Sequence, residues 1–174
     1  MQEPRRIWWA WPRKLCALER PGGGGRSHRA ARRAAEIAYL QARGVRLIVS
    51  TMRTRHNLSE YERAGLDWHH VPVSSTADGA DALEELLPLL RRELRQAGAV
   101  AVHGDSHTDF PAAVCAAHLH EVRGVDPTDA LSAAADMGLM VTPAACALLG
   151  VAYEAVQPRS RIADTTSSGR SVTT

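Results

Sequence analysis

Short apolar runs and longer stretches of helical periodicity alternate along this chain. Residues 45–50 (VRLIVS), 68–73 (WHHVPV) and 99–103 (AVAVH) are mostly apolar runs bounded by polar residues, which is typical of strands buried in a sheet. Between the last two runs, residues 81–96 carry apolar side chains at helical spacing. This order of strand, helix and strand predicts neighbouring parallel strands joined by a helix.

Helical spacing also precedes the first strand and follows the last. Ser27 caps a predicted helix that ends at Gly44. After position 110 three more helices are predicted, one through residues 114–119, one over 128–137 and one over 142–156. The sequence therefore predicts an α/β fold in which helices flank a central, mainly parallel sheet of four or five strands.

The two ends of the chain differ from this pattern. Tryptophans at positions 8, 9 and 11 and four glycines over residues 22–25 predict a short strand or arm that leads into a flexible loop. From residue 157 onward, apolar side chains almost disappear. We expect one domain over residues 1–156 and a disordered tail over residues 157–174.

Composition narrows the class of protein. The 174 residues, 45% of them hydrophobic, suffice for one core. A formal net charge of +2 gives no reason to expect a nucleic-acid partner. The three cysteines lack the spacing of a disulfide framework or zinc site, and no apolar stretch has the length of a signal sequence or membrane span. We therefore expect a cytoplasmic protein that contacts neither nucleic acid nor membrane.

Several phrases of the sequence follow one another in an informative order. They are residues 9–15 (WAWPRKL) with 21–22 (PG), 44–50 (GVRLIVS), 58–72 (LSEYERAGLDWHHVP), 99–112 and 142–144 (TPA). In this order and spacing they resemble the bacterial-type dual-specificity phosphatase family over roughly residues 8–150. In that family a strand ends in His-Cys, and five loop residues then lead to an Arg that begins a helix. The resemblance implies the same α/β phosphatase fold.

The chemistry of that family depends on this loop. Its backbone N–H groups and the helix N-terminus bind a phosphate dianion and lower the pKa of the cysteine, whose thiolate attacks phosphorus. The arginine binds equatorial oxygens of the phosphoryl group, and an aspartate on a neighbouring loop protonates the leaving group.

This chain departs from the family at both reactive ends of the loop. The resemblance retains His103 at the end of the strand but places Gly104 at the nucleophile and Phe110 at the arginine. Pro111 stands where the family has a Ser or Thr that assists the cysteine. Because glycine cannot attack phosphorus and phenylalanine offers no donor to a phosphoryl oxygen, the resemblance implies a phosphatase fold without phosphatase chemistry.

No other residue is well placed to replace the lost groups. In the general-acid loop, residues 73–78 (VSSTAD), a serine aligns with the acid, and Asp78 could act only if that loop is re-formed. Cys115 lies on the apolar run of a predicted helix, where a buried thiol has a raised pKa and behaves as a small hydrophobe. Cys146 falls in the last predicted helix and is no better placed.

Residues 104–110, hereafter the altered loop, carry polar groups of their own. Together with His103 they read His-x-Asp-x-His-x-Asp, which adds Asp105, His107 and Asp109. Three interpretations remain: a site for zinc, iron or manganese, acid–base catalysis on a small molecule, or solvated residues on a non-catalytic binding protein. If the two aspartates face inward, they oppose a phosphate dianion and favour a cation, a neutral polar ligand or proton transfer.

We favour the second interpretation, an enzyme that acts on a small polar metabolite without a metal or cofactor. His107 is the predicted general acid or base, with Asp105 and Asp109 as orienting or proton-carrying groups. The predicted substrate contacts are Ser106, Thr108, Arg53, Ser75 and Asp78, and the predicted supports of the loop are His103, Gly104 and Phe110. The alternative is a pseudophosphatase that binds a ligand or protein partner without turnover.

The purified protein is expected not to hydrolyse para-nitrophenyl phosphate, because loss of the nucleophile alone costs several orders of magnitude in rate. Colorimetric turnover should equal that of a protein-free control. Ordinary phosphatase rates that survive Cys115→Ser would contradict the loss of this chemistry. Rates abolished by that substitution would show that Cys115 is the nucleophile.

Overall fold

Five strands form one sheet in the computed structural model, which describes residues 1–156. In chain order they are β1 (Ile7–Trp11), β2 (Leu15–Leu18), β3 (Val45–Ser50), β4 (Asp67–His70) and β5 (Ala99–His103). Across the sheet the order is β1-β2-β5-β3-β4, with β1 antiparallel to β2 and all other neighbours parallel. The predicted α/β fold with a mainly parallel sheet is confirmed. The predicted tail, residues 157–174, lies outside the described residues.

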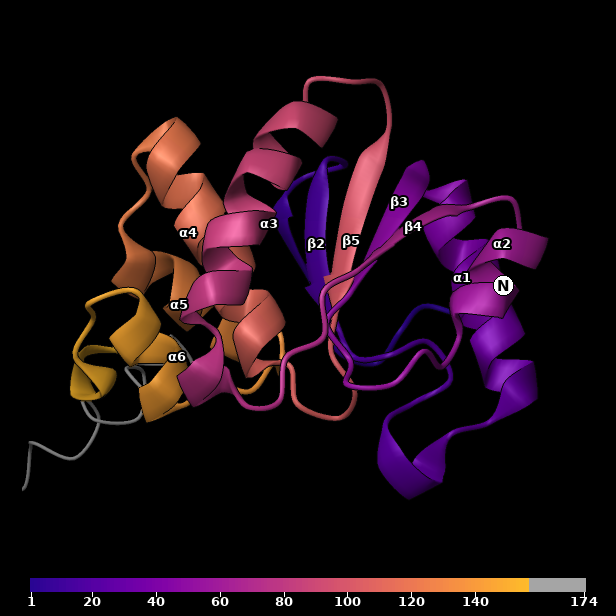
Figure 1. Ribbon diagram of the computed structural model, residues 1–174, viewed down its shortest axis with the longest axis horizontal. Helices are drawn as coiled ribbons and strands as arrows, with labels where there is room; N and C mark the ends of the chain where they lie inside the picture. Colours follow the sequence, from indigo (N-terminus) through magenta and orange to yellow (C-terminus); the bar gives the residue numbers. More distant parts are fainter. Residues whose placement is uncertain (157–174) are drawn as a thin grey trace, which may run out of the picture.

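Helices cover both faces of the sheet (Figure 1). One face carries α1 (Ala30–Ala42) and α2 (Leu58–Arg63), and the other carries α3 (Ala80–Glu93), α4 (Asp109–Arg123), α5 (Pro127–Asp136) and α6 (Pro143–Leu148). Because successive strand residues point to opposite faces, Val100 and Val102 of β5 enter the core under α3 and α4, whereas Ala99 and Ala101 face α1 and α2. No helix within residues 1–156 has both the length and the apolar character needed to cross a membrane.

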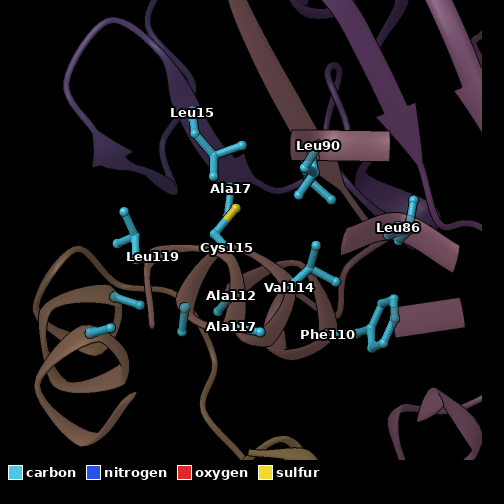
Figure 2. Close-up of a cluster of buried hydrophobic side chains, with 14 of the residues drawn as sticks. Leu15, Ala17, Leu86, Leu90, Phe110, Ala112, Val114, Cys115, Ala117 and Leu119 are labelled. Atoms are coloured by element: carbon cyan, nitrogen blue, oxygen red, sulfur yellow. The ribbon is translucent and has the colours of Figure 1, made fainter. Parts of the chain in front are cut away.

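The N-terminal part of α4 is buried on every side. Residues 109–119 are buried without interruption, because this helix packs against β2, α3, α5 and α6. Leu86 and Leu90 of α3 lie against it (Figure 2). Burial of each such leucine contributes about 1.5–3 kcal/mol. This packing fixes the N-terminus of α4, and with it the end of the altered loop.

Local boundaries differ from the sequence prediction in several places. The N-terminal arm contains two strands, because the chain reverses near Arg13, whose φ is 58°, and returns as β2. Residues 58–63 form the helix α2, which the periodicity did not indicate. The last predicted helix ends at Leu148 and not at position 156, because Gly150 adopts a left-handed φ of 65°.

Candidate active site

A pocket of about 820 Å³ opens at the carboxyl ends of β3 and β5. Its walls come from residues 51–54 after β3, residues 73–77 before α3, the altered loop, and Thr142 and Ala144 at the N-terminal end of α6. Loops that follow neighbouring parallel strands meet at this edge of an open α/β sheet, which is where ligands of such folds bind. The altered loop is therefore one wall of the largest hollow described at this edge.

His103 ends β5 and supports the start of the altered loop. Its ring is fully buried, with Nδ1 2.8 Å from the carbonyl oxygen of Gly104 and Nε2 2.9 Å from the hydroxyl of Tyr61. Because a carbonyl only accepts, we assign the proton to Nδ1, and Nε2 then accepts from the tyrosine. Burial lowers the pKa of His103 to about 4. The ring is therefore neutral at pH 7 and acts as a hydrogen-bonding support.

Gly104 allows a backbone carbonyl to occupy the position of the family's nucleophile. A Cβ atom added at Gly104 would collide with the carbonyl oxygen of His107. The negative end of a peptide dipole therefore points to the place where the resemblance puts the cysteine side chain. An anion cradle needs the opposite polarity, with N–H groups directed inward.

Phe110 fills the space between α4 and the start of α3. Its ring is 3% exposed and packs so closely on Gly79 that a Cβ atom added there would collide with it. Figure 2 shows the ring directed from α4 toward α3. The next residue, Pro111, has no N–H group, so the first turn of α4 lacks both the arginine and one potential donor to a phosphate.

Asp109 is the first residue of α4, and only 5% of it is exposed. Its Oδ2 accepts a 2.8 Å hydrogen bond from the Thr142 hydroxyl, whereas its Oδ1 is buried with no partner among the described residues. The neighbouring Thr108 hydroxyl is buried and accepts from the N–H of Met140 at 2.7 Å. Thr108, a predicted substrate contact, is thus engaged in the fold, and both residues belong to the packed base of the loop.

Asp105 joins the altered loop to residues 21–25, hereafter the glycine loop. Its Oδ1 lies 3.3 Å from Nε of Arg20, a buried guanidinium, and accepts a 3.1 Å hydrogen bond from a backbone N–H of the glycine loop. The two loops also touch directly, since a Cβ atom added at Gly24 would collide with Ser106. Ser106, another predicted substrate contact, therefore packs against the glycine loop, and Asp105 is a tether between the loops.

A buried carboxylate secures the other side of the glycine loop. Glu36 of α1 is fully buried, accepts a 2.8 Å hydrogen bond from the N–H of Gly22 and pairs with Arg32 at 2.6 Å. Arg32 also lies 3.7 Å from Glu19. Removal of one partner from a buried ion pair costs about 3–5 kcal/mol because the other charge is left uncompensated. The glycine loop is thus held in place by charges on both sides.

His107 is the exposed member of the predicted catalytic set and lines the pocket. Asp105 and Asp109 line the same pocket, but their carboxylates are held by Arg20 and Thr142 respectively. Among the hydrogen bonds of residues 1–156, none joins the His107 ring to either carboxylate. The structure therefore gathers the three residues around one pocket without connecting them in a relay.

The remaining predicted contacts divide between two hollows. Arg53 and Ser75 line the main pocket. Asp78 accepts a 2.6 Å hydrogen bond from the Ser75 hydroxyl and lines a separate hollow together with Asp81 and Glu85. The geometry thus places Asp78 beside the main pocket and not in its wall, which does not support a role for it as a replacement general acid.

Sequence reasoning missed a group of hydroxyls that line the pocket, namely Thr51, Thr54, Thr76 and Thr142. Thr51 and Thr54 could have been predicted, because they follow a buried parallel strand and so lie at the edge of the sheet where ligands bind. The same argument had been applied only to Arg53. Thr51 also donates a 3.0 Å hydrogen bond to the carbonyl oxygen of His103. Thr142 is far away in the sequence, and only the docking of α6 against α4 brings it to the site.

The cysteines do not reach the pocket. Cys115 is fully buried, and Figure 2 shows its sulfur directed toward Ala17 of β2. Burial raises the pKa of the Cys115 thiol well above its usual range, which suppresses the thiolate that a nucleophile requires. Cys16 and Cys146 are buried as well. Within residues 1–156, no three His, Cys, Asp or Glu side chains are grouped as metal ligands would be.

Comparison with solved structures identifies the fold: the chain has the fold of dual-specificity and protein tyrosine phosphatases. Human DUSP28 has a TM-score of 0.64 and 22% identity, and the alignment covers 86% of this chain and 95% of DUSP28. A Cys→Ser variant of TpbA from P. aeruginosa in complex with pTyr has a TM-score of 0.65 and 19% identity over 91% of both chains. No family model and no curated protein matches the sequence.

A third similar structure is named as an interacting protein and not as a phosphatase. It is the human tyrosine phosphatase-like serine/threonine/tyrosine-interacting protein, with a TM-score of 0.63 and 14% identity over 84% of this chain and 94% of that one. At such identities the likeness establishes the fold, and the function has to be argued from the pocket.

Restoring the family residues with Gly104→Cys and Phe110→Arg is expected not to produce an efficient phosphatase. The new Cβ atom meets the His107 carbonyl, Asp109 remains at the helix N-terminus, and the missing general acid alone costs a factor of about 10²–10⁴. Hydrolysis of para-nitrophenyl phosphate by the double variant, with circular dichroism to verify folding, measures the outcome. Efficient turnover by the folded variant would show that the loop readily adopts the cradle shape.

The buried His103 is expected to make stability depend on pH. Because the folded-state pKa of about 4 lies below the ordinary value, the unfolded chain binds the extra proton first, so stability falls as pH drops below about 6.5. The loss attributable to His103 between pH 7 and pH 5 is on the order of 2 kcal/mol. Urea unfolding of wild type and His103→Gln at both pH values isolates this share, and an equal pH dependence in the two proteins would contradict it.

Proposed function

We propose that this protein is a phosphatase-fold enzyme that does not hydrolyse phosphate esters and instead acts on a small polar metabolite by acid–base chemistry, with His107 as the general acid or base. The observation that carries the proposal is the polarity of the pocket wall. The His107 carbonyl points to the nucleophile position, and the carboxylate of Asp109 stands at the N-terminus of α4.

Electrostatics supports a ligand other than a phosphate dianion at this wall. The N-terminal end of a helix carries a partial positive charge that stabilises an anion, and in this chain the anion is already present as Asp109. A second negative charge at about 4 Å would be opposed by about 4 kcal/mol at an effective dielectric constant near 20. A neutral or cationic group that donates hydrogen bonds meets no such opposition.

His107 is the group on this wall best suited to exchange protons with a ligand. Imidazole can both donate and accept a proton at neutral pH, and the side chain of His107 is exposed at the pocket. The fixed partners of the two aspartates suggest supporting roles for them. Asp105 positions the loop through Arg20, and Asp109 is held at the N-terminus of α4 by Thr142.

The second candidate function is ligand or partner binding without turnover. The observation in its favour is the separate attachment of Asp105 and Asp109, with no hydrogen bond from the His107 ring to either carboxylate among the described residues. One structure with the same fold is named as an interacting protein, which provides a precedent for the fold and no more.

Substitution of His107 decides between these functions. Wild type incubated with a polar metabolite extract is expected to deplete at least one compound, measured by mass spectrometry, and His107→Ala should slow that depletion by a factor of about 10²–10⁴. The exposed Arg95, which lies after α3 at the opposite end of the sheet, provides the matched control, and Arg95→Ala should retain full activity. No depletion by wild type would favour the binding protein, whereas equal depletion by His107→Ala would contradict the role of His107 as general acid or base.

A further inference from the structure

Another hollow, of about 380 Å³ and distinct from the one lined by Asp78, adjoins the main pocket and is called the second hollow below. It is lined by Arg33, Thr54, Arg55, His56, Asn57, Ser59 and Glu60, from α1, α2 and the segment that follows β3. Thr54 lines both hollows, so they share a wall. The two hollows therefore meet at Thr54.

The second hollow has an excess of positive charge. Glu60 is its one carboxylate, and that group is shared by Arg33 at 3.2 Å and Arg63 at 2.8 Å. Arg55 lies over the ring of Trp68, 5.2 Å from the ring centroid, and has no carboxylate partner among residues 1–156. The aromatic contact holds the guanidinium in place while leaving its N–H donors available.

His28, which lies near this hollow, is also affected by the excess of positive charge. His28 lies between the glycine loop and α1, and its pKa is lowered first by burial and then by the charges of Arg20, Arg33 and His56. Burial disfavours a charge of either sign, but the contributions of Arg20, Arg33 and His56 act against a cation alone and favour an anion near these side chains. The hydroxyls of Thr54 and Ser59 add neutral donors next to the guanidinium groups.

We propose that this basic hollow binds a phosphate group, and that the metabolite of the main pocket carries that phosphate at one end and its reacting polar group at the other. The proposal rests on the proposed function and narrows the substrate class to phosphorylated small metabolites. The phosphate then lies outside the altered loop, away from Asp109 and the His107 carbonyl. Phosphate is favoured over carboxylate because its oxygens can accept from several guanidinium and hydroxyl donors that approach from different directions.

Binding at this hollow can be measured with inorganic phosphate and does not require the substrate. In ¹H–¹⁵N spectra recorded at low ionic strength, phosphate is expected to shift the amide signals of residues 54–60 in a saturable manner. Arg55→Ala should weaken this binding at least tenfold, whereas Arg95→Ala, which removes an exposed arginine at the far end of the sheet, should leave it unchanged. Added salt should weaken it as well, because the site is open to solvent.

Two further arms make the proposal falsifiable. His107→Ala should retain phosphate binding, because the altered loop takes no part in it. The inference is overturned if phosphate shifts the amides of residues 104–110 instead, if Arg55→Ala binds like wild type, or if acetate binds as strongly as phosphate. Phosphate binding without turnover of any metabolite would refute the enzymatic function alone, and turnover of a metabolite that lacks phosphate would refute this inference alone.

Discussion

The burial of α4 is the constraint on which the site depends. Eleven consecutive residues, 109–119, have no free face, so the first turn of the helix cannot shift without disturbing the sheet, α3, α5 and α6 together. In phosphatases of this fold such rigidity suits an anion cradle, because preorganised donors cost nothing to align during the reaction. Here the same rigid position carries Asp109 and Pro111. The helix terminus is therefore as rigid as a cradle requires, but its first residue is an aspartate.

Two ion pairs hold the glycine loop in place near the N-terminus of this helix. Asp105 with Arg20 holds the glycine loop from one side, and Glu36 with Arg32 holds it from the other. One group of each pair, Arg20 in the first and Glu36 in the second, is almost completely buried and has few alternative partners. The sequence places Asp105, His107 and Asp109 in one motif, but the two aspartates are held by Arg20 and Thr142. His107 alone remains exposed among them.

The sheet and its flanking helices could be predicted because hydrophobic periodicity is a local property. Residues 45–50 and 99–103 form strands as their apolar runs indicated, and the resemblance implied the same α/β fold. The predicted strand over 68–73 stops at His70, close to Pro72, which has no N–H for a ladder. The site was harder to predict, because the roles of Asp105 and Asp109 depend on partners 85 and 33 residues away, at Arg20 and Thr142. No local pattern reports such contacts.

The contact between Phe110 and Gly79 restricts substitution at both positions. Each residue sets the size permitted to the other, since any side chain at position 79 would enter the space of the aromatic ring. Replacement of the phenylalanine by a smaller residue would leave a cavity between α3 and α4, at a cost of about 3–5 kcal/mol for alanine. Phe110 and Gly79 therefore constrain each other, so that a change of side-chain size at one position has to be matched by a change at the other.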